Sequence, residues 1–300
     1  MEFGPGPLES LVSVSRLNLS PQDRVLVLGA SGWFGLTFLR LLDPDIPVLA
    51  LASSTRDRFE TWDEQRVQEF APTAVANFAF RTPEFAEREG IERFIQANES
   101  LTEQFLDAAQ LPSVRAILTV SSGAAVAFAL EMAENPYGVL KKREEDAALA
   151  LATESRSVVI ARAWSVSGPD VRRPSDYAFS GFILQAQSGR IDIAAQQPVF
   201  RRYVSVEDLL TVCMTRLLDG WTGTIDSGGE LIEMGELAAR VAAQVNLGSV
   251  IERAEMALTE PLIYASDNVS WMEACGRIGF VPLDLDEQIR VTAAGFLQRP

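Results

Sequence analysis

Short apolar runs alternate with amphipathic stretches along the first half of the chain. The apolar runs are too short for helices and predict buried parallel strands at residues 25–28, 47–52, 73–80, 114–120 and 158–163. Between them, apolar residues recur at helical spacing and predict helices at residues 36–42, 62–70, 91–110 and from Asn135 onwards. Asn135 can cap its helix, and Pro136 suits the first helical position. This alternation predicts a parallel sheet with helices on both faces.

The pattern is looser beyond residue 165. It predicts a short strand at residues 223–226, and helices at residues 178–188, 206–218, 233–245, 268–276 and 286–297. We therefore expect a smaller, α-rich layer over one edge of the sheet.

Three glycines stand between the first predicted strand and the first predicted helix. Gly29, Gly32 and Gly35 follow one another at intervals of three residues. In this context Gly29 allows a tight turn, Gly32 lets the backbone approach a pyrophosphate, and Gly35 lets strand and helix pack closely. The anion would lie at the helix N-terminus, where free N–H groups and the helix dipole favour negative charge. The stretch predicts a dinucleotide site, and an ordinary strand-to-helix turn is the alternative.

Together these elements predict an α/β protein: a Rossmann-type, doubly wound parallel sheet with a smaller, α-rich C-terminal substrate-binding region. The expected division has three parts. Residues 1–22 form an N-terminal leader, residues 23–165 plus about 200–227 form the dinucleotide-binding domain, and residues 166–199 plus 228–300 form the substrate-binding region.

The end of the second predicted strand indicates which dinucleotide binds. NAD sites carry an acidic residue near this point, where it accepts hydrogen bonds from the adenosine ribose. Here Ser53, Ser54 and Arg56 precede the first carboxylate, Asp57. Small hydroxyls with an arginine suit a 2′-phosphate, so we expect NADP to be preferred over NAD. The alternative is a solvated Arg56, with the ribose hydroxyl bonded to Ser53 or Ser54.

Tyr137 and Lys141 lie four residues apart on the last predicted helix of the first half, and therefore share a face. An ammonium close to a phenol favours the phenolate, which otherwise forms only near about pH 10. The preceding strand ends at Ser121 and Ser122, at the edge of the sheet where ligands bind in doubly wound folds. These residues predict an acid–base site. The alternative is a surface tyrosine beside a solvated Lys141 that pairs with a neighbouring glutamate.

Composition narrows the possible chemistry. The chain has 300 residues, 47% of them hydrophobic, with a net charge of −15 and no histidine. The negative charge disfavours nucleic acid and anionic membranes as partners, and no apolar run is long enough for a membrane span. The missing histidine excludes a Ser-His-Asp triad, and two distant cysteines, Cys213 and Cys275, offer no metal site. We expect a cytoplasmic protein without a metal.

Several further segments occur in a characteristic order. They are GASGWFG at 29–35, NFAF at 77–80, QANESLTEQFLDAA at 96–109, VSSG at 120–123, YGVLK at 137–141, RAWSVSGP at 162–169 and RRYVSVEDL at 201–209. This series resembles the extended short-chain dehydrogenase/reductase family, in the NAD(P)-dependent epimerase/dehydratase/ketoreductase branch that acts mainly on nucleotide-activated sugars. The resemblance runs from about residue 24 to the end of the chain.

The resemblance implies a role for each matching residue. Tyr137 would be the acid–base, with Ser122 or Ser121 as the neighbouring hydroxyl, and Lys141 would bind the nicotinamide ribose. Arg201 would face the diphosphate of the substrate, with a surface salt bridge as the alternative, and Ser122 and Gly123 would also contact the substrate. The other cofactor contacts would come from the three glycines and from Ser31, Trp33, Phe34, Asp63, Phe78, Ala79, Phe80, Asn98, Ala163, Trp164 and Val166. A homodimer is implied in the same way.

The sequence departs from the family at the strand-end triplet, whose third position usually carries the catalytic hydroxyl and is Gly123 here. Ala124 and Ala125 replace the Asp-Glu pair of the family's dehydratases, which disfavours dehydration. We therefore expect an NAD(P)-dependent oxidoreductase that reduces or epimerises a nucleotide-activated sugar. The alternatives are a cofactor-binding sensor without catalysis and a reductase of a non-sugar carbonyl compound.

Overall fold

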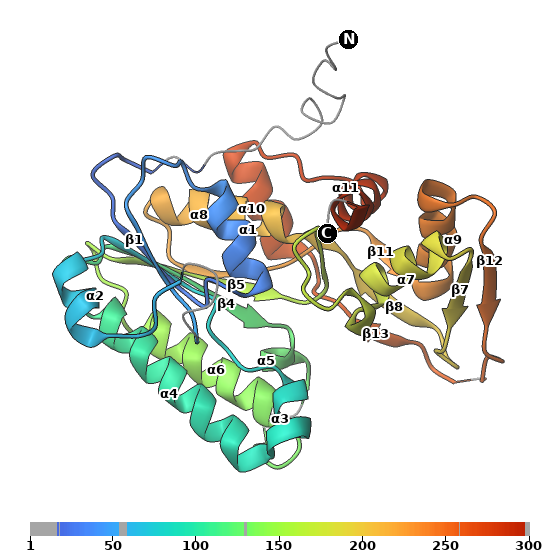
Figure 1. The fold of residues 1–300 in the computed structure, drawn as a ribbon, viewed down its shortest axis with the longest axis horizontal. Coiled ribbons are helices and arrows are strands. Elements are labelled where there is room, and N and C mark those ends of the chain that lie inside the picture. The colour runs from blue at the N-terminus through green and yellow to red at the C-terminus, as the bar shows by residue number, and fades with distance from the viewer. Residues whose placement is uncertain (1–16, 18, 54–58, 129–130, 258, 298–300) are drawn as a thin grey trace, which may run out of the picture.

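The computed structural model describes residues 17, 19–53, 59–128, 131–257 and 259–297. Its centre is a six-stranded parallel sheet in the order β10-β5-β4-β3-β1-β2 (Figure 1). The strands are β1 (Val25–Leu28), β2 (Val48–Leu51), β3 (Ala74–Asn77), β4 (Ala116–Ser122), β5 (Ser157–Ala163) and β10 (Gly223–Asp226). The predicted parallel sheet is confirmed, and its strands differ from the predicted ranges by a few residues at their ends.

Helices cover both faces of this sheet (Figure 1). On one face lie α1 (Trp33–Leu41), α8 (Val206–Leu218) and α10 (Val269–Ile278), and on the other lie α2 (Glu64–Phe70), α4 (Ile91–Ala109) and α6 (Pro136–Leu149). Side chains alternate between the two faces, so Val25 and Val27 join one apolar core while Leu26 and Leu28 join the other. Because both sides are buried, the strand is apolar at every position.

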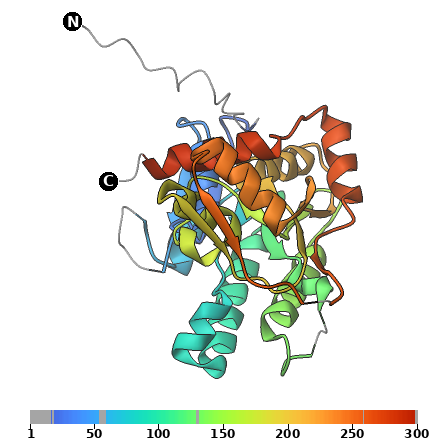
Figure 2. The same cartoon turned by 90° about the vertical axis from the view of Figure 1, so that its right-hand side faces the viewer.

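The C-terminal region has its own core beside one edge of the sheet (Figures 1 and 2). Its helices are α7 (Ala178–Gln187), α9 (Met234–Val245) and α11 (Leu285–Leu297). Phe179, Ile183, Leu237 and Ile289 are among the apolar side chains that these helices bury together. The predicted helical character of this region is therefore confirmed.

Several elements were not predicted. Two are short helices, α3 (Pro83–Glu89) and α5 (Ala124–Ala127). The C-terminal region also contains a three-stranded sheet in the order β11-β8-β13 and two strand pairs, β12-β7 and β6-β9. These strands are β6 (Val166–Ser167), β7 (Arg190–Ile193), β8 (Val199–Arg202), β9 (Val204–Ser205), β11 (Leu231–Glu233), β12 (Val250–Arg253) and β13 (Leu262–Tyr264).

Two polar contacts hold α11 in place. Ser167 on β6 donates to the side-chain oxygen of Gln288 on α11 at 2.7 Å. The Leu283 N–H, just ahead of α11, donates at 2.9 Å to Asp208 on α8, which packs against the central sheet. The division into domains stays a prediction, and most of the expected leader, residues 1–16 and 18, lies outside the described residues. Within the described part of the chain, no helix is long and apolar enough to cross a bilayer.

Candidate active site

The glycine turn joins β1 to α1 with the geometry that its sequence predicts. Gly29 has a φ of +75°, and a Cβ on it would lie 2.6 Å from the backbone N of Ala79. A Cβ on Gly35 would lie 2.4 Å from the Gly29 carbonyl oxygen, so this glycine allows the helix to pack against the strand. Gly32 caps α1, and a Cβ there would approach only the Gly29 oxygen, at 3.2 Å. Its outer side is left open to a ligand.

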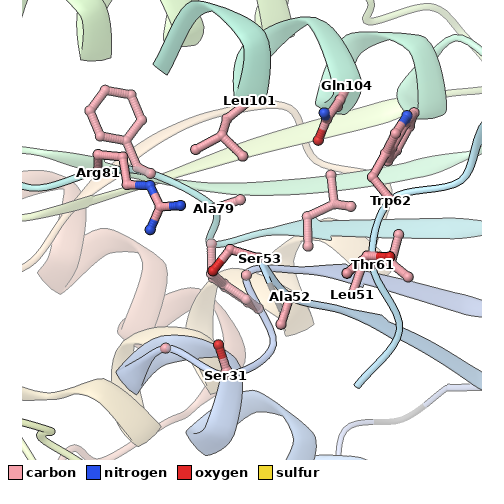
Figure 3. Close-up of a pocket in the computed structure, with 15 residues that line it drawn as sticks. Ser31, Leu51, Ala52, Ser53, Thr61, Trp62, Ala79, Arg81, Leu101 and Gln104 are labelled. Carbon is pink, nitrogen blue, oxygen red and sulfur yellow. The ribbon is translucent and has the colours of Figure 1, made fainter. Parts of the chain in front are cut away.

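A cleft of about 450 Å³ opens beside this turn, at the carboxyl ends of β1, β2 and β3 (Figure 3). The predicted residues that line it are Gly29, Ser31, Gly32, Ser53, Phe78, Ala79 and Phe80. Ser54 and Arg56, on which the expected preference for NADP also depends, lie outside the described residues. No carboxylate is among the residues that line the described part of this cleft.

A second cavity of about 410 Å³ shares Gly32, Phe78 and Phe80 with the first. The predicted residues that line it are Trp33, Phe34, Ser121, Ser122, Tyr137, Lys141, Ala163, Trp164 and Val166. The structure therefore brings the glycine turn, the end of β4 and the start of α6 together around two cavities that share part of their lining.

Asn135 and Pro136 place Tyr137 in the first turn of α6. The Asn135 side chain accepts from the Gly138 N–H at 2.9 Å and donates to the Ala124 carbonyl at 3.1 Å, which ties the helix start to the end of β4. The Tyr137 ring lies edge-on to Phe80, with ring centroids 5.6 Å apart. Burial raises the pKa of the Tyr137 hydroxyl well above its ordinary value, and a hydrogen bond with Ser122 offsets part of this rise.

Lys141 is buried instead of solvated. It is 4% exposed, donates to the Val120 carbonyl at 2.8 Å and to Glu144 Oε1 at 3.0 Å, and lies 3.8 Å from the centroid of the Phe80 ring. Burial lowers the pKa of Lys141, and Glu144 opposes that effect. The expectation that Lys141 lowers the pKa of Tyr137 is not met in this structure, because the ammonium is paired with Glu144 and burial dominates at the phenol.

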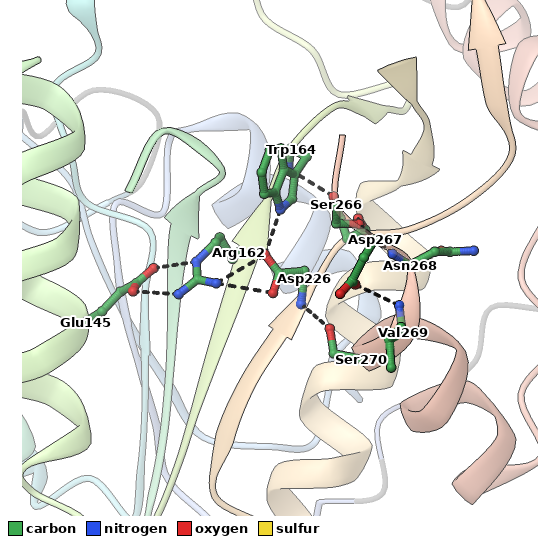
Figure 4. A network of polar contacts seen from close by, with 10 residues as sticks. Glu145, Arg162, Trp164, Asp226, Ser266, Asp267, Asn268, Val269 and Ser270 are labelled. Carbon is green, nitrogen blue, oxygen red and sulfur yellow. Dashed lines mark hydrogen bonds and ion pairs between the residues drawn. The ribbon is translucent and has the colours of Figure 1, made fainter. Parts of the chain in front are cut away.

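Trp164 covers Gly123, the position where the family usually has its hydroxyl. A Cβ on Gly123 would lie 2.4 Å from Trp164 Cδ2. The indole is held by its N–H, which donates to Asp226 at 2.6 Å, and Asp226 is in turn paired with Arg162, which also binds Glu145 (Figure 4). Gly123 lines neither cavity, so the structure leaves Ser122 as the hydroxyl next to Tyr137.

Arg201 lies in β8, outside both cavities. Its guanidinium carbon is 4.8 Å from the centroid of the Tyr264 ring, and it has no carboxylate partner among the described residues. The alternative of a surface salt bridge is therefore not found there. Tyr264 also forms hydrogen bonds with Ser122 and with the backbone of Ala124. Arg201 is therefore connected with Ser122 through the Tyr264 side chain.

Two predicted cofactor residues have structural roles. Asp63 caps α2, where its side chain accepts from the Arg66 N–H at 3.0 Å, and it does not line the cleft. Asn98 is buried on α4 and binds the backbone of Arg81, accepting from its N–H at 2.7 Å and donating to its carbonyl at 3.3 Å. It therefore fixes the segment that follows β3.

The comparison with family models agrees with this arrangement. The model described as the NAD dependent epimerase/dehydratase family matches residues 25–224. The chain belongs to this family. No curated protein matches the sequence at a significant level.

Solved structures share the fold at low sequence identity. RMD from Pseudomonas aeruginosa, complexed with NADPH, superposes with a TM-score of 0.70 at 21% identity, over 93% of this chain and 100% of that one. The UDP-glucose 4-epimerase of Thermus thermophilus, with NAD, has a TM-score of 0.71 at 20% identity, over 92% and 100%. A GDP-mannoheptose C4 reductase from Campylobacter jejuni, with NADP, has a TM-score of 0.71 at 14% identity, over 94% and 100%.

The cavities of this family member also contain residues that the sequence patterns did not indicate. In the first cleft they include Thr61, Trp62, Arg81, Leu101 and Gln104, and in the second they include Thr82, Arg172, Arg173 and Tyr177. For the arginines a signal existed, because Arg81 directly follows the NFAF strand end and Arg172 follows the break at Gly168 and Pro169. The aromatic and aliphatic residues come from helices and loops, and local periodicity does not show which way they face.

Proposed function

We propose that this chain is an NAD(P)-dependent oxidoreductase that acts on a nucleotide-activated sugar, either by reducing a keto-sugar or by epimerisation. The observation that carries the proposal is the second cavity, where Tyr137, Ser122 and Lys141 line the same space as Gly32. The residues present fit a dinucleotide. Trp33 Nε1, Arg81 Nε and Ser121 Oγ are buried in residues that line the two cavities and have no hydrogen-bond partner within the described part of the chain.

When bound, the nicotinamide group supplies or accepts the hydride, and the protein supplies orientation and proton transfer. Tyr137 would exchange a proton with the substrate oxygen, and Ser122 would orient the Tyr137 hydroxyl through the hydrogen bond between them. Because burial raises the pKa of Tyr137, the phenol is protonated at neutral pH. A protonated phenol can donate its proton to a carbonyl oxygen, which is the proton transfer that reduction requires.

NADP is the proposed cofactor in preference to NAD. Ser53 lines the first cleft, and no carboxylate among the described lining residues could accept hydrogen bonds from a ribose 2′-hydroxyl. Ser54 and Arg56 follow Ser53 in the sequence, and a hydroxyl and a guanidinium suit a 2′-phosphate. Of the three structural neighbours named above, one is complexed with NADPH, one with NAD and one with NADP, so the fold itself is compatible with either dinucleotide.

A nucleotide-linked substrate is supported by Arg201, which contacts the Tyr264 ring, and this ring lies 5.0 Å from that of Trp164 in the lining of the second cavity. Arg201 has no carboxylate partner among the described residues, and a guanidinium of this kind suits the paired oxygens of a diphosphate. The names of two structural neighbours refer to UDP-glucose and to GDP-mannoheptose. Ala124 and Ala125 carry no acid–base group, so dehydration is disfavoured.

The test combines binding with turnover. Dinucleotide binding is titrated first with NADPH and NADH, and turnover of UDP-, dTDP- and GDP-linked keto-sugars is then followed through the absorbance of the reduced nicotinamide. We expect Tyr137→Phe to lower kcat by about 100-fold or more and to leave dinucleotide affinity nearly unchanged. Tyr203→Phe is the matched control, because Tyr203 lies in the core of the C-terminal region.

Each outcome bears on one part of the proposal. Absence of binding for both dinucleotides would overturn it, and binding of NADH without NADPH would contradict the cofactor preference. Unchanged turnover in the Tyr137 variant would remove this residue from the acid–base role.

A cofactor-binding sensor is the second candidate, because Trp164 fills the space beside Gly123 and the usual hydroxyl is missing. Dinucleotide binding without turnover of any substrate would favour it. Turnover of a small free ketone, with no binding of nucleotide sugars, would instead favour a reductase of non-sugar carbonyl compounds.

A further inference from the structure

Arg81 lines the first cleft, and its backbone and its side chain are both held by neighbouring residues. Asn98 holds its backbone on both sides, and the Phe85 ring lies under its guanidinium, 5.2 Å from the carbon to the ring centroid. Its Nε is buried and has no hydrogen-bond partner, and no ion pair within the described residues includes this side chain. Figure 3 shows the guanidinium in the same cleft as Ser31 and Ser53.

Arg172 approaches the same turn from the second cavity. It lies in the loop after β6, and its guanidinium donates to the carbonyl oxygen of Ser31 at 2.6 Å. It lines the second cavity together with Gly32 and Trp33, and within the described residues it too has no carboxylate partner. The two arginines therefore belong to the two cavities that meet at Gly32.

Unpaired arginines are unexpected in a chain with 41 acidic and 26 basic residues. Arg40, Arg162 and Arg240 each contact at least two carboxylates. Arg81 is half-buried and Arg172 is exposed, and neither has a carboxylate partner among the described residues. A guanidinium in this state forms charge-assisted hydrogen bonds with a bound anion. The backbone feature that both arginines share is the glycine turn, whose N–H groups at the start of α1 also favour an anion.

We propose that Arg81 and Arg172 together bind the diphosphate of the dinucleotide, one from each side of Gly32. The proposal rests on the proposed function, since it assumes that a dinucleotide binds there. The two arginines match the two negative charges of the diphosphate, and the planar fork of each can contact two oxygens. Because Arg172 belongs to the expected substrate-binding region, this contact would also hold that region against the glycine turn when the cofactor binds.

The test measures binding by calorimetry, so that it does not depend on turnover. The ligands are NADPH, NADH, ADP-ribose, which has the diphosphate but no 2′-phosphate, and adenosine, which has neither. The variants are Arg81→Gln, Arg172→Gln, the double variant, and Arg190→Gln as the control for the change in net charge, since Arg190 is exposed on β7. Arg81→Lys keeps the charge and removes the fork, and it replaces Arg81→Gln if that variant does not fold.

We expect Arg81→Gln and Arg172→Gln each to weaken the binding of NADPH, NADH and ADP-ribose by about tenfold. Adenosine should bind with unchanged affinity, and Arg190→Gln should have no effect. If the affinities for NADPH, NADH and ADP-ribose all change by less than twofold in both variants, the proposed role of the two arginines is overturned and the proposed function stands. Weaker binding of NADPH alone would also overturn that role, because the arginines would then contact the 2′-phosphate. If the unaltered protein binds none of the ligands, the proposed function fails as well.

Discussion

At the scale of single residues, the Trp164 indole occupies the space that a side chain at position 123 would need. The spacing of Tyr137 and Lys141 and the pair of serines at the end of β4 could be interpreted from the sequence, since they follow local periodicity. The position of Trp164 could not. Its indole is held by Asp226, 62 residues away, and a contact of that kind leaves no local pattern. The sequence therefore indicated that a hydroxyl was missing but not what had taken its place.

The position of the indole predicts that a serine at position 123 would not restore the missing catalytic hydroxyl. Gly123→Ser would put a Cβ 2.4 Å from Trp164 Cδ2, so the indole or the loop must move. We expect a loss of about 1–3 kcal/mol in the free energy of unfolding, the usual cost of overpacking, and no gain in turnover. Urea unfolding measures it, with Gly276→Ser on α10 as the control because a Cβ there meets nothing within 4 Å. A stable and faster Gly123→Ser variant would contradict this account of Trp164.

At the scale of elements, α6 carries the polar groups of the site on one face. Tyr137, Lys141 and Glu144 follow one another at helical spacing, and Glu144, 1% exposed, also accepts a hydrogen bond from Thr119 on β4 at 3.2 Å. Thr119 in turn accepts from Asn77 on β3 at 3.1 Å. A buried polar chain therefore connects the lysine of the site to the centre of the sheet.

Removing Glu144 should leave Lys141 as an unpaired buried cation. We expect Glu144→Gln to lose about 3–5 kcal/mol in the free energy of unfolding at neutral pH, whereas the exposed Glu103→Gln on α4 should change little. Without Glu144 the pKa of Lys141 falls further below its ordinary value, so the folded state releases this proton more readily than the unfolded state. The loss should therefore shrink as the pH rises towards about 10, where the lysine also becomes neutral in the unfolded chain. Unfolding curves at neutral and alkaline pH would show this, and a loss independent of pH would refute it.

The elements that the sequence predicted are those with a distinctive local pattern of apolar residues. Continuous apolar runs marked the central strands, and an amphipathic period marked the long helices. The strands of the C-terminal region were missed because they are short, half-exposed and paired across long separations. In β8, for example, Arg201 pairs with Ile232 on one side and with Tyr264 on the other. The same pairing explains why Arg201 contacts the site through Tyr264 and not directly.

At the scale of the whole molecule, the sheet domain and the C-terminal region are connected through α8. Asp208 lies in its first turn, is buried, and accepts the Leu283 N–H ahead of α11. Burial is the main cause that raises the pKa of this carboxyl to about 6 from 3.8, although the hydrogen bonds from Leu283 and Ser205 oppose it. The contact therefore joins the two parts of the chain through a group that titrates under mildly acidic conditions.

The sign of this shift predicts how stability depends on pH. Because the folded-state pKa lies above the unfolded value, folding takes up a proton between about pH 4 and 6, and the stability that protonated Asp208 contributes is lost as the pH rises through this window. Asp208→Asn keeps an oxygen that can accept from Leu283 and cannot ionise. Relative to the unaltered protein, the variant should gain about 2–3 kcal/mol in the free energy of unfolding on going from pH 4 to pH 7. Urea unfolding at the two pH values measures the difference, with Asp192→Asn on the exposed face of β7 as the control. A difference that does not change with pH would mean that folding does not raise the pKa of Asp208.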